Sequence, residues 1–394
     1  MQSSGEWSLP EKHILAWLMM VEGIGQSRLR LIVLAHKKGE IRLSEIWRQP
    51  AILVKLLKLK KIEESIHILQ NEYTPAKVGE WLVRHHIHII TEDELVYPPL
   101  LKQIHRPPIM LFCQGALDKS WWDIPVAVVG SRHMTEYGRM VTNTLVAQLV
   151  ELGASIVSGG MYGVDLTAHQ AAVKNQGKTL ILLGYGFGHS YPAWIQPKHQ
   201  TILEGGGVIM SQFAPLSTPT KGSFVARNRL VAGLSQTVLV VEAAVRSGTH
   251  LTVEFALDEG RDVCAVPGPI GNPYSQGTKW LINQGARLVT SGVEIISPET
   301  SFTYPKFLNQ QARQLPIHEK KILNNVGHNP SPISQQILSL LQVQPLSANQ
   351  VLSQMQPLTS GLKPATLSLI LSELTDLEMR GQITRFGQYY RAIS

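Results

Sequence analysis

Val126-Ala127-Val128-Val129-Gly130-Ser131-Arg132 is a short apolar run that ends at a glycine turn. Similar runs rich in Val, Ile and Leu follow along the chain, at residues 155–158, 179–183, 208–211, 237–241, 263–266 and 287–290. Stretches with helical character lie between the runs, at residues 136–152, 164–175, 194–203, 226–234, 249–258 and 276–283. Strands that are apolar throughout are typical of parallel sheets, because connecting helices cover both faces. Residues 111–300 are therefore predicted to form a doubly wound, mainly parallel α/β domain of the Rossmann-like class.

Residues 1–110 show mostly helical spacing of their apolar residues, which predicts an N-terminal helical domain of the helix–hairpin–helix or SAM-like type. Within it, Glu22-Gly23-Ile24-Gly25-Gln26 forms a Gly-x-Gly break, and the helix that follows carries Arg28 and Arg30. Helix–hairpin–helix modules use such a break to hold a DNA phosphate on the amides at the start of a helix. A helix end and a turn in a small bundle account for the same residues without a ligand. Both interpretations stay open, and the second is favoured because glycine is the usual residue at a helix end.

The C-terminal part of the chain is predicted to be a separate unit. Residues 301–332 are rich in Gln, Asn, Pro and Ser, a composition typical of a linker. Residues 333–394 then show three helical stretches, the last at 364–379, and a hairpin pattern at 383–391, which together indicate a winged-helix domain. The third helix carries several acidic side chains, so a contact with another protein is favoured over the reading of DNA.

The composition favours a polyanionic partner. The chain has 394 residues, with 36 Lys and Arg against 29 Asp and Glu and a net charge of +7, and basic proteins attract nucleic acid first. Its two cysteines, Cys113 and Cys264, begin no Cys-x-x-Cys motif, which argues against a disulfide scaffold and a cysteine-rich zinc site. No stretch approaches the roughly 18 apolar residues of a membrane span, and the N-terminus lacks the basic head of a secretory signal. We therefore expect a soluble, cytoplasmic protein without membrane contact.

Loops rich in glycine follow the first three predicted strands. Gly130-Ser131-Arg132 places an arginine where a dinucleotide-binding turn would need a close approach of the backbone, and an arginine there can hold a phosphate through two hydrogen bonds. Gly159-Gly160-Met161-Tyr162-Gly163 and Gly184-Tyr185-Gly186-Phe187-Gly188 can turn sharply and present N–H groups to an anion. Asp165, in the helical turn after the second loop, is expected to cap that helix.

The fourth segment, residues 221–229, is the most specific, and we expect it to be a loop. Lys221-Gly222-Ser223-Phe224-Val225-Ala226-Arg227-Asn228-Arg229 combines basic side chains with an aromatic ring, which is how single strands are held without sequence reading. The alternative is structural, with Phe224 in the core and the arginines on a surface helix. The neighbouring glycine loops favour the binding interpretation. Arg246-Ser247-Gly248-Thr249, before a further helix, offers another anion site.

Short motifs occur in a fixed order through the central region. They are Val-Gly-Ser-Arg at 129–132, Ser-Gly-Gly-x-x-Gly-Val-Asp at 158–165, Tyr191-Pro192, Arg-Asn-Arg-x-x-Ala-Gly-Leu at 227–234, Val-Val-Glu-Ala at 240–243, Ser247-Gly248-Thr249, Ala-Val-Pro-Gly at 265–268 and Asn-Gln-Gly-Ala at 283–286. In this order they resemble the DNA-processing protein A family, also called DprA or Smf, over residues 126–292. The resemblance implies a bacterial protein of natural transformation that protects incoming single-stranded DNA, brings the RecA recombinase to it and forms a homodimer through the central domain.

The resemblance also implies a DNA pocket with Arg132, Lys221, Phe224 and Ser247. Some members carry a basic residue directly after Tyr-Pro, where this chain has Ala193, and Lys198 is the nearest candidate for that role. The candidate DNA-binding residues are Ser131, Arg132, Gly159, Gly160, Gly163, Lys198, Lys221, Phe224, Arg227, Asn228, Arg229, Ser247, Gly248 and Thr249.

Other chemistries have weaker support. His85-His86-x-His88 falls in a predicted strand without acidic or cysteine partners at regular spacing, so no metal site is expected. The chain has neither a Gly-x-Ser-x-Gly nucleophile turn nor a P-loop. The alternative function is a nucleotide-sugar hydrolase of the lysine-decarboxylase-like Rossmann class. Enzymes of this class bind a phosphate with a glycine-rich loop followed by a glutamate, and Ser247-Gly248-Thr249 with Glu254 is a partial match to that loop. We expect a binding protein without catalytic residues, metal or cofactor.

Overall fold

The computed structural model describes residues 7–59, 61–296, 332–343, 346–355, 367–379, 382–386 and 389–392. The chain divides into two compact units, residues 1–302 and residues 303–394. In the part of the chain that the structure describes, no helix combines the length and the apolar character needed to cross a membrane.

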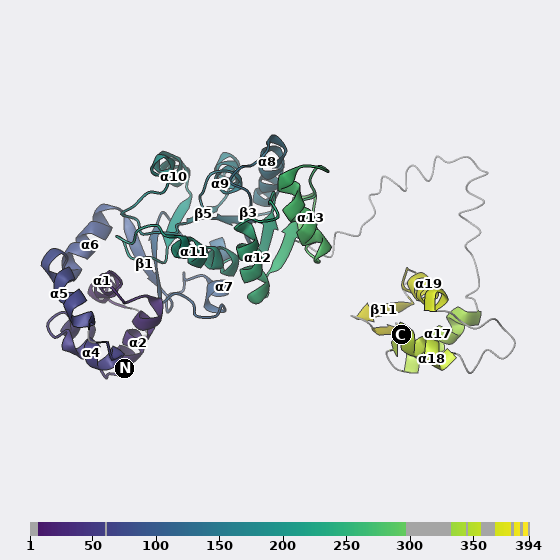
Figure 1. Cartoon of the computed structure of the whole chain (residues 1–394), viewed down its shortest axis with the longest axis horizontal. Helices are drawn as coiled ribbons and strands as arrows, with labels where there is room; N and C mark the ends of the chain where they lie inside the picture. The colour runs from purple at the N-terminus through teal and green to yellow at the C-terminus, as the bar shows by residue number, and fades with distance from the viewer. Residues whose placement is uncertain are drawn as a thin grey trace. The chain divides into compact units, whose positions relative to one another are not determined.

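A twisted sheet of nine strands runs through the described part of the first unit (Figure 1). In chain order the strands are β1 (Ile87–Thr91), β2 (Met110–Gln114), β3 (Pro125–Val129), β4 (Ser155–Ser158), β5 (Thr179–Leu182), β6 (Val208–Ser211), β7 (Thr237–Val240), β8 (Asp262–Ala265) and β9 (Arg287–Leu288). Their order in the sheet is β1-β2-β6-β5-β4-β3-β7-β8-β9. The pairs from β6 to β9 are all parallel, whereas β2 pairs antiparallel with both β1 and β6. The predicted doubly wound, mainly parallel sheet is thus confirmed, and each predicted apolar run contributes a parallel strand.

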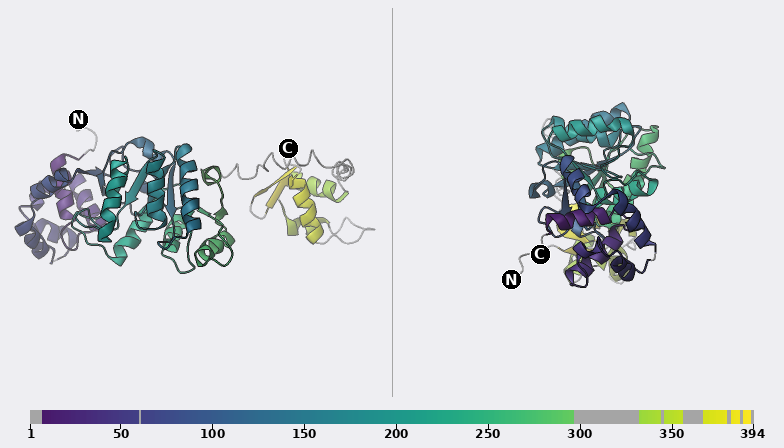
Figure 2. Two further views of the ribbon diagram at one scale, coloured as in Figure 1. Left: turned by 90° about the horizontal axis from the view of Figure 1, so that it is seen from above. Right: turned by 90° about the vertical axis from the view of Figure 1, so that its left-hand side faces the viewer.

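Helices cover both faces of the parallel strands (Figures 1 and 2). One face carries α8 (Glu136–Glu151), α9 (Val164–Lys174), α10 (Gln196–Glu204) and α14 (Gly292–Ile296). The other face carries α7 (Pro99–Lys102), α11 (Lys221–Gly233), α12 (Thr249–Asp258) and α13 (Gln276–Asn283). Successive strand residues point to opposite faces, so Val157 packs under α11 and α12 while Ile156 packs under α8 and α9. Two cores therefore form from the same continuous apolar strands.

The N-terminal helices share a core with the antiparallel end of the sheet. They are α1 (Leu9–Leu18), α2 (Gln26–Lys37), α3 (Leu43–Ile46), α4 (Ala51–Leu57), α5 (Ile62–Glu72) and α6 (Pro75–Arg84). Trp17 and Leu29 pack with Ile89, Met110 and Phe112 on one face of β1 and β2. Strand β2 is absent from the predicted strands, although its Met-Leu-Phe-Cys stretch is entirely buried. The strand predicted around His88 is present as β1, and the sheet therefore begins well before residue 126, where the first of the apolar runs assigned to it lies.

The second unit has its own small core. Its described elements are α17 (Pro332–Val343), β10 (Leu346–Ser347), α18 (Ala348–Met355), α19 (Leu367–Met379), β11 (Ile383–Phe386) and β12 (Tyr389–Ala392). The strands form an antiparallel sheet in the order β10-β12-β11, and Ile337, Val351 and Leu374 lie in the core below it. The winged-helix assignment stays a prediction. Most of the predicted linker, residues 301–331, and the predicted start of the third helix, 364–366, lie outside the described residues.

Candidate functional site

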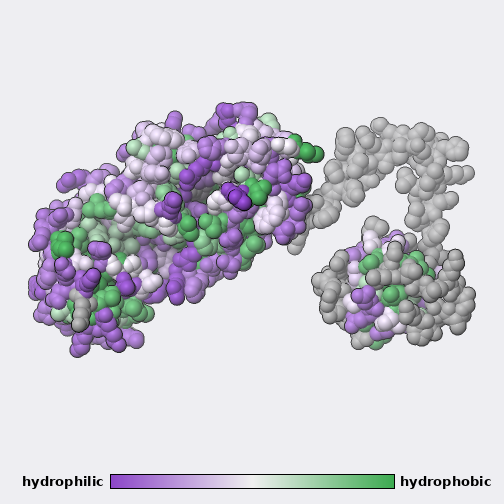
Figure 3. Space-filling model, in the orientation of Figure 1, coloured by the Kyte–Doolittle hydropathy of each residue, from purple (hydrophilic) through white to green (hydrophobic). Residues whose placement is uncertain are grey.

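A cavity of about 420 Å³ lies at the carboxyl ends of β3, β4 and β7. Successive strands run outward from β3 on one side, and the chain then returns to place β7 on the other side. Open parallel sheets bind ligands where the strand order reverses in this way. Figure 3 shows a hollow near the middle of the first unit, surrounded mainly by hydrophilic residues. Eight of the predicted residues line the cavity: Ser131, Arg132, Gly159, Arg227, Asn228, Ser247, Gly248 and Thr249.

The loop after β3 is fixed by its backbone, while its arginine side chain stays exposed. The Ser131 N–H donates a hydrogen bond to the Glu242 carbonyl at 2.7 Å. The guanidinium carbon of Arg132 lies 5.8 Å from the centre of the Tyr162 ring and 6.0 Å from that of Phe224. Both distances fall within the range of cation–π attraction. Arg132 is thus held near two rings with its N–H groups at the cavity.

Glycines in the loop after β4 allow two loops to meet. Gly163 has a φ of +86°, and a Cβ at this position would overlap the Ser131 carbonyl oxygen. The next residue, Val164, donates its N–H to that same oxygen at 3.2 Å. Gly160 has a φ of +67°, and its carbonyl accepts a hydrogen bond from His199 Nε2 at 2.7 Å. Gly160 and Gly163 are not among the residues that line the cavity, and their conformations shape the loop; their contact with DNA stays a prediction.

The third glycine loop supports an aromatic ring and does not line the cavity. A Cβ on Gly184 would lie 2.7 Å from the Phe224 ring, so only glycine lets this ring pack there. The Ser223 hydroxyl donates to the Gly184 carbonyl at 2.5 Å. Phe224 is half-buried at the rim of the cavity, beside Arg132.

The fourth predicted loop is in fact helical, which corrects the prediction for residues 221–229. Helix α11 begins at Lys221, because Thr220 accepts a hydrogen bond from the Ser223 N–H and Ser223 accepts one from the Thr220 N–H. This capping box starts the helix five residues before the predicted start at 226. The basic residues consequently point in different directions around a helix.

Arg227 points inward and is 4% exposed. Its guanidinium donates to the carbonyl of Leu182 at 2.6 Å and to the carbonyl of Gly159. Burial lowers the pKa of this arginine, and the nearby Asp165 carboxylate opposes that shift. Arg227 therefore joins α11 to the ends of β4 and β5 and forms the floor of the cavity.

Arg229 lies away from the cavity. Its guanidinium donates to the carbonyl of Arg106 at 3.0 Å and to that of His105. Positions 227 and 229 are about 200° apart around a helix, which is why the structure brings only the first of the two to the cavity.

The loop after β7 closes the remaining side of the cavity. The Ser247 hydroxyl oxygen accepts a hydrogen bond from the Thr249 N–H at 3.2 Å, and Gly248 immediately precedes α12. Arg246 also lines the cavity and is exposed. The start of α12 and the Arg246 side chain thus face the same space as Arg132.

Several cations around this region form no hydrogen bond or ion pair within the described part of the chain, although the Asp165 carboxylate attracts Arg132. Among the described residues, the side chains of Arg132, Lys198, Lys221 and Arg246 form no hydrogen bond or ion pair with the protein. Lys221, at the first position of α11, and Lys198, on α10, are exposed and lie outside the cavity lining. Unpaired cations beside a cavity can bind an anion without first breaking a contact.

Sequence reasoning missed some residues that share this site. Tyr162, His133 and Trp194 form a chain of ring contacts, with centres 6.2 Å apart for His133 and Tyr162 and 5.7 Å apart for Tyr162 and Trp194. Tyr162 lies inside the glycine motif at residues 158–165, so the sequence carried a signal for its place in this loop. Asp165, expected to cap a helix, lines the cavity. Nothing in the sequence pattern indicated that the Trp194 ring would be exposed.

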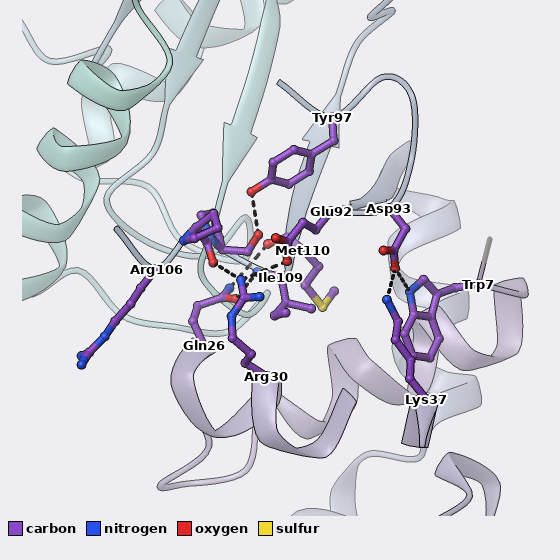
Figure 4. A network of polar contacts seen from close by, with 12 residues as sticks. Trp7, Gln26, Arg30, Lys37, Glu92, Asp93, Tyr97, Arg106, Ile109 and Met110 are labelled. Atoms are coloured by element: carbon purple, nitrogen blue, oxygen red, sulfur yellow. Dashed lines mark hydrogen bonds and ion pairs between the residues drawn. The ribbon is translucent and has the colours of Figure 1, made fainter. Parts of the chain in front are cut away.

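The N-terminal Gly-x-Gly turn is a packing contact in this structure (Figure 4). Gln26, the first residue of α2, accepts a hydrogen bond from the Ile109 N–H at 2.9 Å and donates to the Gln212 carbonyl at 2.9 Å. Arg30 pairs with Glu92 at 3.0 Å, and Arg28 donates to the Gly23 carbonyl. These contacts agree with the favoured interpretation, in which the turn needs no ligand.

The three histidines near β1 lie in different settings. His85 stacks on Trp81 with ring centres 4.2 Å apart, and its Nδ1 lies 2.8 Å from the Trp81 carbonyl oxygen. His86 has a φ of +54°, and His88 lies on β1.

Comparison with known proteins identifies the family to which the chain belongs. A sequence model for the family "DNA recombination-mediator protein A" matches residues 88–299. The match includes every strand loop described above and extends further toward the N-terminus than the resemblance over residues 126–292.

Individual relatives agree. Protein Smf of Escherichia coli (strain K12) is 40% identical over 266 residues, which cover 64% of this chain and 69% of that protein. DNA processing protein DprA of Streptococcus pneumoniae is 40% identical over 201 residues, which cover 51% of this chain and 70% of that protein. The X-ray structure of S. pneumoniae DprA superposes with a TM-score of 0.60 at 29% identity and covers 74% of this chain and 98% of that one. The predicted resemblance is confirmed, and the chain belongs to the DNA recombination-mediator protein A (DprA/Smf) family.

Proposed function

We propose that the cavity at β3, β4 and β7 binds single-stranded DNA, and that the protein protects incoming DNA during natural transformation and helps to load the RecA recombinase. The observation that carries this proposal is the setting of Arg132, whose guanidinium lies within about 6 Å of the Tyr162 and Phe224 ring centres and forms no hydrogen bond or ion pair among the described residues. The arginine supplies a positive charge that can bind a phosphate, and the neighbouring rings can stack on a base. A base-paired duplex keeps its bases stacked inside the helix, so this combination favours single strands.

Each part of the cavity would have a distinct task. Arg132 and Arg246 would neutralise phosphates, with Lys221 and Lys198 extending the basic surface. The Asn228 amide nitrogen would donate a hydrogen bond to a phosphate or sugar oxygen, and the positive end of the α12 dipole would attract a phosphate. Phe224 would stack on a base. Because these contacts are to backbone and to ring faces, little sequence preference is expected.

We further propose that the protein acts as a homodimer in the cytoplasm. A groove of about 860 Å³ lies between α12, α13 and the edge of the sheet. It is bordered by the exposed apolar side chains of Leu257 and Trp280, and β9 beside it is the last strand of the sheet. Exposed apolar surface at a sheet edge supports pairing with a second copy. Sedimentation of Leu257→Asp, which should be monomeric where the parent chain is dimeric, tests this.

The proposed activity is binding without turnover. The alternative nucleotide-sugar hydrolase would need Glu254 beside Ser247-Gly248-Thr249. Glu254 borders the α12–α13 groove and is not among the residues that line the smaller cavity. Release of base or phosphate from a nucleotide by the pure protein would favour the hydrolase.

The test of the proposed function is the affinity for DNA of the full chain. Fluorescence anisotropy with a labelled oligonucleotide, single-stranded or annealed, is measured across a salt series. We expect tighter binding of the single strand and a steep loss with salt. Equal affinity for the blunt duplex would contradict the cavity as the site. RecA loading is tested separately, by the rate of RecA filament growth on single strands already covered by a single-strand-binding protein.

A further inference from the structure

A row of aromatic rings continues from the cavity onto the surface beside it. Tyr162 lies beside Arg132 and has its ring centre 5.7 Å from that of Trp194. Phe224 also lies beside Arg132, and its ring centre lies 5.6 Å from that of Tyr191. Tyr191 and Trp194 come from the same short segment between β5 and α10. Two pairs of rings thus connect the Arg132 guanidinium to the exposed side chains of Tyr191 and Trp194.

The outermost ring is unusually exposed for its size. Trp194 is 57% exposed, whereas the next residue, Ile195, is fully buried. The 3-10 helix η2 (Ala193–Ile195) therefore anchors through Ile195 and turns the indole toward solvent. A single exposed apolar residue is ordinary. This one differs because ring-to-ring contact connects it to Tyr162 and so to the cavity.

We infer that Trp194 is a second stacking surface, which holds a further base of the strand whose phosphate and base occupy the cavity. The inference rests on the proposed function and extends it by a residue outside the cavity lining. Tyr162 keeps the indole in place from one side, and the exposed part of the indole is open to a base. Lys198, four residues further along and without a polar partner among the described residues, can take a phosphate of the same stretch. Trp194 and Lys198 would thus add to the affinity for DNA mainly by stacking on a base and less by attracting a phosphate.

This arrangement makes a specific demand on the ligand. A stacking surface needs a base, whereas a cation needs only the sugar-phosphate chain. DNA that lacks bases at several positions should therefore lose the Trp194 contact and keep the charge contacts. The competing occupant is a protein partner that packs on the indole. In that case the affinity for DNA would not depend on Trp194, with or without bases.

The test uses the full chain with two oligonucleotides of about 20 nucleotides, oligo(dT) and the same length with abasic sites. Trp194→Ala should bind oligo(dT) about five- to tenfold more weakly, with an unchanged salt slope. Trp194→Phe keeps a ring and should restore the affinity to within about twofold. On the abasic oligonucleotide, Trp194→Ala and the parent chain should bind equally. A thermal unfolding curve for each variant controls for folding.

The outcomes separate the two proposals. If the parent chain prefers single strands and Trp194→Ala binds oligo(dT) as tightly, the inference is overturned and the cavity stands. An equal loss on both oligonucleotides also overturns it, since the contact would not depend on a base. If the parent chain shows no preference for single strands, the proposed function fails and the inference fails with it.

Discussion

Two glycine turns in this chain precede helices and carry nearby arginines, yet the structure uses them differently. At the N-terminal turn, Arg30 is paired with Glu92 and Gln26 is bonded to the backbone of β2. At the cavity, the Arg132 and Arg246 side chains form no hydrogen bond or ion pair among the described residues. A glycine turn with basic residues is therefore a weak sign of an anion site. What distinguishes the two is whether the cations are already satisfied within the protein.

The largest expected effect is on DNA affinity, from removing one cation that lines the cavity, Arg132, and one exposed cation beside it, Lys221. Arg132→Ala with Lys221→Ala should weaken single-strand binding by roughly 2–6 kcal/mol, because each charge-assisted contact contributes about 1–3 kcal/mol. The slope of log affinity against log salt should become shallower by about 1.4. Fluorescence anisotropy across a salt series measures both quantities.

The matched control removes an arginine just after the N-terminal turn and a lysine at the other end of α2. Arg28 and Lys38 are both exposed, so Arg28→Ala with Lys38→Ala changes the net charge equally at little cost in stability. It should leave binding nearly unchanged. If this control loses as much affinity as the cavity pair, the N-terminal turn also contacts DNA and the comparison collapses.

The two turns should also differ in their need for glycine. Gly163→Ala places a side chain at a φ of +86° and against the Ser131 carbonyl, so the free energy of unfolding should fall by about 2–4 kcal/mol. Gly25 has a φ of −96°, and a Cβ at this position would meet open space. Gly25→Ala should therefore change the free energy of unfolding by less than about 1 kcal/mol. Urea unfolding measures both. A small effect at Gly163 would mean that the two loops need not meet closely.

A smaller effect, on stability, is expected from replacing Gln26, which bonds the N-terminal turn to the rest of the first unit. Gln26→Ala leaves the Ile109 N–H without its partner, and should lower the free energy of unfolding by about 1–3 kcal/mol. DNA affinity should not change. Gln49→Ala, an exposed glutamine in the same helical region, is the control and should be neutral. Reduced DNA affinity of a folded Gln26→Ala protein would assign the turn a binding role.

The smallest effect is expected from removing the C-terminal part. A chain that ends after Ile296, the last residue of α14, keeps every residue of the cavity. Its affinity for single strands should match that of the full chain within about twofold. A folded truncated protein with poor binding would show that residues after 296 belong to the DNA site.

Much of the fold could be predicted because the strands are apolar throughout. Runs such as Val126 to Val129 are buried on both faces, and a strand covered by helices on both sides is the arrangement that most often produces such a run. Strand β2 was missed because it is a short run beside proline-rich turns, and its pairing with β6 depends on residues about a hundred positions away. A sequence pattern carries local periodicity and cannot report which distant strand will be the partner.

The candidate site could be predicted as a set of loops, but not as directions of side chains. Arg227 and Arg229 are equivalent in a motif, yet one is buried below Gly159 and the other contacts residues 105 and 106. The capping residues Thr220 and Ser223 carried the signal that residues 221–229 begin a helix. Had that signal been used, the opposite directions of the two arginines would have followed from helix geometry.

The antiparallel pairing of β2 with β6 has a consequence for how the first unit unfolds. Because this ladder joins the N-terminal helices to the parallel strands, the first unit should unfold in one cooperative transition. Removing the chain before β3 would leave the buried strand β6 as a bare edge, with unpaired amides available to any other extended chain. The pairing of β2 with β6 therefore also covers an edge that would otherwise invite aggregation.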